Sequence, residues 1–302
     1  MDQKSLISFL VLAEELQFSR AASRLGLTQS ALSQQIARLE KELGVALFER
    51  TKRSVRLSDC GQVFLSDAQD VITQIDKAVE TARRAAKGQL GKLTIAYVDA
   101  APFSILSPLL IAFRRQYPDV RISLHEMTSG EQFSALQQGK IDVGLLRPMF
   151  DADWLRSATL LRETYVIAMW REHDLAAFDE VDFRQLNNEK FIFTSIEKAR
   201  YINSKFMPIF KRHGMFPIIV QEVNQLHALL SLVGAGMGLA LIPLSVARNN
   251  NHGVIYRNIA GMESPYAELD IAWRDDNNKT LVKNFIRIAR GISSSLENPY
   301  PA

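Results

Sequence analysis

The sequence predicts a multi-domain chain with an all-α head, a long linker helix and a two-lobed α/β region. In the head, apolar residues recur at helical spacing in three short segments before Gly44. In the linker, apolar residues follow a heptad pattern from Phe64 to Ala85. From residue 92 onward, strand-like and helical segments alternate, which is typical of sheets covered by helices. We therefore expect domains at residues 1–58, 59–88 and 89–302.

The composition favours a folded protein of the cytoplasm. The chain has 302 residues, of which 47% are hydrophobic, enough for more than one core. Its apolar stretches are shorter than the ~18 residues of a membrane-spanning helix, so no membrane partner is expected. The first residues lack the layout of a signal peptide. The single cysteine, Cys60, excludes an intramolecular disulfide.

Three helices and a turn are expected in the head. The first helix has an apolar face formed by Leu6, Phe9, Leu10, Ala13 and Leu16. Ser19 is expected to cap the second helix and Thr28 the third, because their hydroxyls accept hydrogen bonds from free N–H groups at a helix start. Gly26 marks the turn between these two helices, and Gly44 ends the third.

The head also carries a local excess of positive charge. Between Arg20 and Arg56 there are eight Lys or Arg residues against three Glu, a difference of +5, whereas the whole chain has a net charge of +3. Two short strands at 50–53 and 55–57 are expected to form a basic wing. Polar side chains occupy one face of the third helix, namely Gln29, Ser30, Ser33, Gln34 and Arg38. Such groups bind base edges and phosphates, so we expect double-stranded DNA as a partner. A helical bundle without a DNA function is the alternative.

The linker segment predicts one helix of about 28 residues, capped by Ser58. Its heptad stripe consists of Phe64, Ala68, Val71, Ile75, Ala78, Ala82 and Ala85. An isolated helix would expose this stripe to water, so pairing with a second copy of the chain is expected. Packing of the stripe against its own chain is the alternative.

The remaining residues predict parallel sheets in two lobes. Strands are expected at 93–98, 120–125, 141–146, 165–169, 191–194, 218–223, 239–242 and 269–273. Helices are expected at 103–117, 132–138, 204–213, 226–234 and 280–293. We place lobe I at about 92–161 and 269–302 and lobe II at about 162–268, with a ligand cleft near the strand ends.

No pattern of residues indicates catalysis, a cofactor or a metal. The five His residues lack metal-ligand spacing. The glycines at 234–238 follow a helix and precede a strand, the reverse of a dinucleotide-binding loop, so a helix end and a turn are expected. Cys60 is expected to be a small buried residue, and a redox-sensitive thiol is the alternative. We expect a protein that is not an enzyme.

Several segments resemble the LysR-type transcriptional regulators, and the resemblance covers the whole chain. In the first part these segments are residues 19–25, 29–33, 39–44, 47–50 and 57–61. In the second part, residues 113–118, 139–144 and 233–239 resemble the periplasmic-binding-protein-like effector domain of that family. Residues 125–132 are most similar to the branch that senses aromatic-catabolism intermediates such as muconate and benzoate.

The resemblance implies a regulator that binds promoter DNA through a winged helix-turn-helix, as a homodimer or homotetramer. RNA polymerase is a candidate partner. The residues expected to bind DNA are Arg20, Gln29, Ser30, Ser33, Gln34, Arg38, Arg50 and Arg53. Ser30 replaces the Pro common in the family and Gln34 the frequent Arg or His, which leaves the operator sequence open.

The resemblance also implies a small-molecule effector in the cleft, for which an aromatic or dicarboxylic acid is a candidate. The residues expected to bind it are Asp99, Ala100, Thr128, Ser129, Arg147 and Ile202. Hydroxyls and free N–H groups at positions 128 and 129 suit an anion. Asp99 departs from the small residue of the muconate-sensing branch and favours an amine or a hydroxyl instead.

Two of these residues have structural alternatives. Asp99 is also a candidate helix N-cap, and Arg147 is a candidate for an ion pair with an acid such as Glu126. Two other functions stay open for the whole chain: a small-molecule binding protein whose head serves assembly, and an enzyme that acts in the cleft.

Overall fold

The computed structural model describes residues 1–51, 54–148, 150–194, 200–223, 225–248, 253–261 and 265–296. The chain divides into two compact units, Met1–Arg84 and Ala85–Ala302. Within the described ranges, no helix has both the length and the apolar character that crossing a membrane requires.

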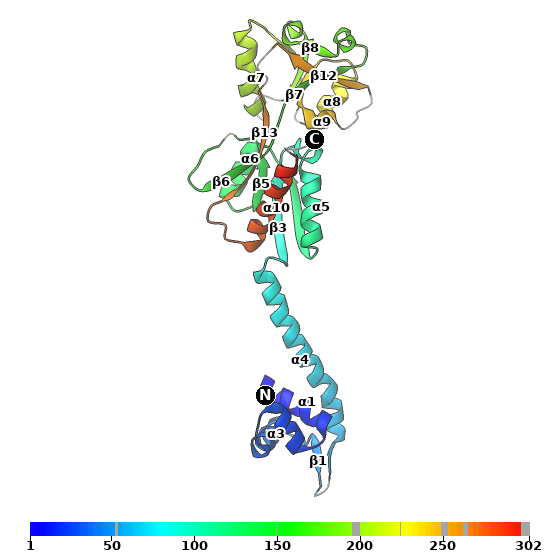
Figure 1. Cartoon of the computed structure of the whole chain (residues 1–302), viewed down its shortest axis with the longest axis vertical. Helices are drawn as coiled ribbons and strands as arrows, with labels where there is room; N and C mark the ends of the chain where they lie inside the picture. Colours follow the sequence, from blue (N-terminus) through cyan, green and yellow to red (C-terminus); the bar gives the residue numbers. More distant parts are fainter. Residues whose placement is uncertain are drawn as a thin grey trace. The chain divides into compact units, whose positions relative to one another are not determined.

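The first unit is a three-helix head with a two-stranded wing and nearly all of a long helix (Figure 1). Its elements are α1 (Gln3–Glu15), α2 (Phe18–Leu25), α3 (Gln29–Leu43), β1 (Phe48–Arg50), β2 (Val55–Leu57) and α4 (Asp59–Ala86). The core forms around Phe9, whose ring lies 5.4 Å from that of Phe48 and 5.1 Å from that of Phe64. Leu32 and Ile36 of α3 are fully buried in the same core.

Three caps on two helices agree with the sequence prediction, and a fourth does not. The Thr28 hydroxyl accepts a hydrogen bond from the Ala31 N–H at 3.2 Å, and the Ser58 hydroxyl accepts one from the Gly61 N–H at 2.9 Å. Gly44 ends α3 with a φ of 72°. The expected cap at Ser19 is wrong, because α2 begins at Phe18, whose ring packs against the head core.

The wing begins earlier than expected. The first strand is Phe48–Arg50 rather than 50–53, with Phe48 paired to Leu57 and Arg50 to Val55. Phe48 is buried, so the core fixes this register, and the Thr51 N–H bonds to the Ser54 carbonyl across the turn. Arg53 lies outside the described residues.

Lobe I of the second unit is a five-stranded sheet in the order β4-β3-β5-β13-β6. Its strands are β3 (Gly91–Tyr97), β4 (Val120–Glu126), β5 (Val143–Leu146), β6 (Leu155–Glu163) and β13 (Ala267–Arg274). Helices α5 (Leu106–Gln116) and α10 (Thr280–Leu296) share one core on one face, where the rings of Phe113 and Phe285 lie 5.1 Å apart. Helix α6 (Ser129–Gln137) packs on a separate apolar cluster with β3 and β13.

Lobe II holds a four-stranded sheet, β11-β7-β12-β8, and the parallel pair β9 and β10 (Figure 1). The strands are β7 (Tyr165–Trp170), β8 (Glu180–Asp182), β9 (Lys190–Thr194), β10 (Ile218–Val223), β11 (Ala240–Pro243) and β12 (Val254–Ala260). The helices are α7 (Arg200–Arg212), α8 (Leu226–Gly234) and α9 (Leu244–Ala247). Gly236 has a φ of 77° in the turn between α8 and β11, which confirms a turn at the glycine-rich segment.

The expected parallel pairing holds for β3 with β4 and β5, but not for all strands of these sheets. Strand β13 is antiparallel to both β5 and β6, and β7 is antiparallel to β11 and β12. The sequence pattern missed β6, β8 and β12, which belong to these sheets. In β6 most side chains are at least partly exposed, because it is an edge strand with only Leu160 buried, so no apolar run marks it.

Candidate DNA-binding surface and effector cleft

Helix α3 separates a buried face from an exposed polar face. Leu32, Ile36 and Leu39 are buried in the head core. On the other side Gln29, Ser30, Gln34 and Arg38 are exposed and Ser33 is half-buried. The polar face therefore does not pack inside its own unit and remains accessible to a duplex.

Two of the residues expected to bind DNA carry weak ion pairs on the surface. Arg20 lies 2.9 Å from the Glu15 carboxylate, and Arg38 lies 3.6 Å from Glu42 with an 80% exposed side chain. Exposed pairs of this kind contribute little to stability. Both guanidinium groups can therefore exchange these carboxylates for a phosphate at small cost.

Arg50 is held more firmly, through a residue that the sequence pattern did not single out. Glu40 accepts hydrogen bonds from the Leu47 and Phe48 N–H groups at 2.9 and 3.1 Å. Its other oxygen lies 2.9 Å from Arg50, whose guanidinium also stacks 4.9 Å from the Phe18 ring centre. The Glu40 side chain is only 17% exposed. Glu40 thus ties α3 to the wing, and Arg50 has a structural partner besides any phosphate.

The heptad stripe of α4 divides into two parts. Phe64 and Ala68 pack into the head core, which bears out self-packing for the first turns. Farther along, Ile75 is half-buried, whereas Val71, Ala78, Ala82 and Ala85 are exposed, with Val71 at 43%. Cys60 is also exposed, so the expectation of a small buried residue is wrong; it precedes Gly61, which takes the buried position against Leu47 instead.

A cavity of about 800 Å³ lies between the two lobes of the second unit. All six residues predicted to bind an effector line it: Asp99, Ala100, Thr128, Ser129, Arg147 and Ile202. They come from the ends of β3, β4 and β5 and from the two helices α6 and α7. This volume lies in the range of small-molecule pockets.

The start of α6 presents donor groups to this cavity. The Ser129 hydroxyl, on a side chain 8% exposed, accepts a hydrogen bond from the Arg147 N–H at 3.0 Å. The N–H groups of Ser129 and Gly130 are at the first helical positions and have no hydrogen-bond partner among the described residues. The expected donors at Thr128 are both engaged, because its N–H and its hydroxyl donate to Glu131 at 2.7 and 2.8 Å in a capping box.

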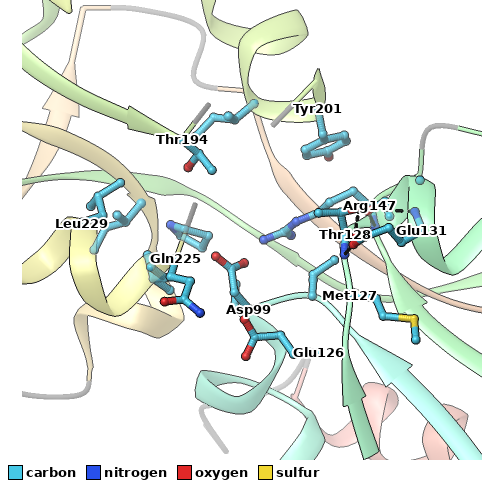
Figure 2. Close-up of a pocket in the computed structure, with 18 of the residues that line it drawn as sticks. Asp99, Glu126, Met127, Thr128, Glu131, Arg147, Thr194, Tyr201, Gln225 and Leu229 are labelled. Carbon is cyan, nitrogen blue, oxygen red and sulfur yellow. Dashed lines mark hydrogen bonds between the residues drawn. The ribbon is translucent and has the colours of Figure 1, made fainter. Parts of the chain in front are cut away.

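Arg147 is the cation of the cavity. Its side chain donates to the Glu268 carbonyl at 2.7 Å and lies over the Tyr201 ring, 5.7 Å from its centre. Within the described part of the chain it forms no ion pair, so the alternative of a salt bridge with Glu126 is wrong. Figure 2 shows the Arg147 guanidinium pointing toward the Asp99 carboxylate across the cavity.

Asp99 is half-buried at the end of β3. Burial raises the pKa of its carboxyl group above 3.8, while the charge of Arg147 and the N–H groups of Ala100 and Leu226 oppose that rise. The alternative of a helix N-cap is wrong: the 3-10 helix that follows, Ala101–Phe103, has Ala100 at its cap position and no side-chain cap bond.

Several residues of the cavity were not predicted. Tyr165, Thr194, Tyr201 and Gln225 all line it from lobe II. Tyr165 is 4% exposed, burial raises its pKa, and its hydroxyl has no hydrogen-bond partner among the described residues. Tyr165 begins an apolar strand and looks like a core residue in the sequence, so nothing local marks it.

Two family models match the chain in succession. Residues 4–62 match the bacterial regulatory helix-turn-helix proteins of the lysR family, and residues 86–292 match the LysR substrate binding domain. The chain belongs to the LysR family. It is a DNA-binding transcriptional regulator with an effector-binding domain, and not an enzyme.

Its LysR relatives cover almost the whole length. The HTH-type transcriptional regulator AlsR of Bacillus subtilis (strain 168) is 36% identical over 289 residues, which is 96% of this chain and 95% of AlsR. The Hca operon transcriptional activator HcaR of Escherichia coli (strain K12) is 32% identical over 293 residues, with 96% and 97% covered.

Solved structures of the aromatic-catabolism branch are among the neighbours. Full-length CbnR in complex with its target DNA is 26% identical, with a TM-score of 0.86, 97% of this chain and 100% of that chain covered. The BenM effector binding domain with its effector benzoate is 25% identical, with a TM-score of 0.60 and 70% and 96% covered.

Proposed function

We propose that this LysR-type regulator is controlled by a small carboxylate-bearing effector in the cavity between its lobes. The observation that carries the proposal is the convergence of Arg147, the Ser129 hydroxyl and two free N–H groups of α6 on one cavity. Donors at a helix start attract an anion. The likeness to the BenM domain that holds benzoate supports the same assignment.

Residues 1–58 act in this proposal as the DNA-reading head, 59–88 as a dimerisation linker and 89–302 as the sensor. The exposed part of the α4 stripe, from Val71 onward, supports pairing of two chains, and two such dimers would form the tetramer. Gln29, Ser33 and Gln34 read bases, while Arg20, Arg38, Arg50 and Arg53 contact phosphates. This regulator acts on cytoplasmic DNA, with RNA polymerase as a further partner.

An effector changes promoter binding only if it prefers one arrangement of the lobes over another. The test uses the full-length protein, a DNA fragment from upstream of its own gene, and benzoate or muconate as probes. We expect Ser129→Ala to reduce the response of DNA binding to a probe at least tenfold, because a hydroxyl that faces the ligand is lost, while DNA affinity without the probe is kept. Gel-shift titration measures both.

Ser134→Ala serves as the control, since Ser134 is exposed on the same helix and its hydroxyl bonds only to the Gly130 carbonyl. A Ser129→Ala protein with a normal response would remove this cavity as the effector site. Failure of the unmodified protein to bind the fragment at modest ionic strength would contradict the proposed DNA-binding role of the head.

A further inference from the structure

The charges that line the cavity do not suit a simple acid. Among the described residues that line it are the carboxyl groups of Asp99, Glu126 and Glu131 and one guanidinium, that of Arg147. Glu131 is engaged in the cap of α6, where it accepts from the Thr128 N–H at 2.7 Å. Asp99 has the N–H groups of Ala100 and Leu226 and the charge of Arg147 beside it, while Glu126 forms no ion pair within the described ranges. A monocarboxylate bound at Arg147 would bring a third negative charge close to them.

Asp99 and Glu126 form an acidic side of the cavity. Asp99 follows β3, and Glu126 ends β4, where it pairs in register with Tyr97 of β3. Neither carboxyl group forms an ion pair within the described ranges of the chain. Figure 2 shows both side chains directed into the same part of the cavity. Two neighbouring carboxylates repel each other, and both would attract a ligand cation placed between them.

The donor side consists of Ser129, Gly130 and Arg147, whose guanidinium points toward Asp99 (Figure 2). An anion there meets two free N–H groups, a hydroxyl and a guanidinium. The cavity is therefore divided into a side for a negative group and a side for a positive one. Apolar residues of lobe II complete the wall, namely Leu226, Leu229, Leu241 and Ile242.

A tyrosine of lobe II adds a polar group to the cavity wall. Tyr165 lines the cavity, is more than nine-tenths buried, and leaves its hydroxyl without a partner among the described residues. A polar atom of a bound molecule can form a hydrogen bond with this hydroxyl.

We propose that the effector is an amino acid with an apolar body, whose carboxylate lies at Ser129 and Arg147 and whose ammonium group lies at Asp99 and Glu126. This inference rests on the proposed function and names the ligand class of the same cavity. It replaces the aromatic or dicarboxylic acid that the family resemblance suggests with a zwitterion, and Asp99 becomes a residue that determines specificity.

The experiment compares matched probes on the full-length protein by isothermal titration calorimetry. Leucine is compared with isocaproate, which lacks the amino group, and with isoamylamine, which lacks the carboxylate. Phenylalanine is compared in the same way with hydrocinnamate and phenethylamine. We expect at least one amino acid to bind ten times more tightly than either of its counterparts. Asp99→Asn should reduce the preference for the amino acid over the deaminated acid at least tenfold.

Asp179→Asn is the matched control, since Asp179 is exposed on lobe II and does not line the cavity. The proposal is overturned if neither amino acid binds, if the deaminated acids bind equally well, or if Asp99→Asn keeps the preference. A deaminated acid that alters DNA binding where the amino acids do not would refute the zwitterion and leave the proposed function standing. Loss of every probe effect on DNA binding would refute the proposed function itself.

Discussion

On α3, different side chains pack the helix into the core and face the proposed DNA site. Leu32 and Ile36 are fully buried, whereas Ser33 and Gln34 between them face outward. A substitution at either of these two polar positions can therefore change DNA contacts without opening the core. Ser33 and Gln34 donate and accept hydrogen bonds of the kind that base edges offer in the major groove.

We expect Ser33→Ala and Gln34→Ala each to reduce discrimination between operator and random DNA. A good base contact contributes about 1–3 kcal/mol, so the ratio of the two affinities should fall by roughly five- to 150-fold. Competition gel shifts with both DNAs measure this ratio. An equal loss of affinity for both DNAs would mean that these side chains contact the DNA backbone rather than the bases.

Asp99 makes a prediction about pH. Because burial raises its pKa in the folded state, the folded protein binds this proton more tightly than the unfolded chain, and the ionised form destabilises the fold. The contribution of Asp99 to stability is fully present below pH 3.8. It is lost as the pH rises through the raised pKa of the folded state. Asp99→Asn should therefore raise the Tm at neutral pH without ligand, and this gain should shrink on acidification. A gain that does not depend on pH would contradict this account.

These two sites show how far the sequence can predict function. The polar face of α3 follows from helical spacing within fifteen residues, so it could be placed without a structure. Asp99, Ser129 and Arg147 follow strands of the first lobe, and family resemblance located them. Tyr165 and Tyr201 could not be found, because their positions depend on how a second lobe lies across the cavity.

At the scale of elements, a close contact joins the wing to α4. A Cβ atom at Gly61 would lie 2.1 Å from the Leu47 carbonyl oxygen. That oxygen also accepts the Ser58 N–H at 2.9 Å, just before α4 begins. Only glycine lets the first turn of α4 approach the backbone at the start of the wing this closely.

Gly61→Ala should accordingly destabilise the head by about 1–3 kcal/mol, since the methyl group meets backbone that cannot rotate away. Circular dichroism during thermal unfolding of the full-length protein measures the loss, and operator binding should weaken with it. Cys60→Ala is the control, because Cys60 is exposed in the same turn. Equal stability of the two variants would mean that the backbone at Leu47 can move away from the added methyl group without cost.

Element prediction succeeded where the pattern is local and failed where it is not. Helix α4 and the cap at Ser58 follow from heptad spacing and one side chain. The relative direction of the strands does not follow from any such pattern. Strand β13 lies between β5 and β6 although it is more than a hundred residues away from β6 in the sequence. Its antiparallel pairing is therefore decided by the assembled sheet and not by its own residues.

At the scale of the whole molecule, the exposed part of the α4 stripe predicts the oligomer. Val71, Ala78 and Ala82 lie on one side of the helix and are exposed in the single chain. Burying such a stripe against a second copy would remove apolar surface from water and hold two heads together. One head alone would reach only half of a two-fold symmetric site.

Ala78→Asp should therefore dissociate the proposed dimer, because it places a charge in the stripe. Sedimentation velocity should show a smaller species, and operator affinity should fall by at least tenfold while the circular dichroism spectrum is kept. Thr73→Asp is the control, since Thr73 lies on the opposite side of the same helix. Unchanged size for Ala78→Asp would locate the dimer contact elsewhere.

The position of β13 also determines the order in which the chain can fold during its synthesis. This strand lies inside the sheet of lobe I but is made after all of lobe II. Nearly the entire polypeptide must therefore leave the ribosome before the sheet of lobe I can be completed. The core of the head lies within Met1–Arg84, so it can form while translation continues. A nascent regulator would thus hold a finished DNA-reading module before it has any means of sensing a ligand.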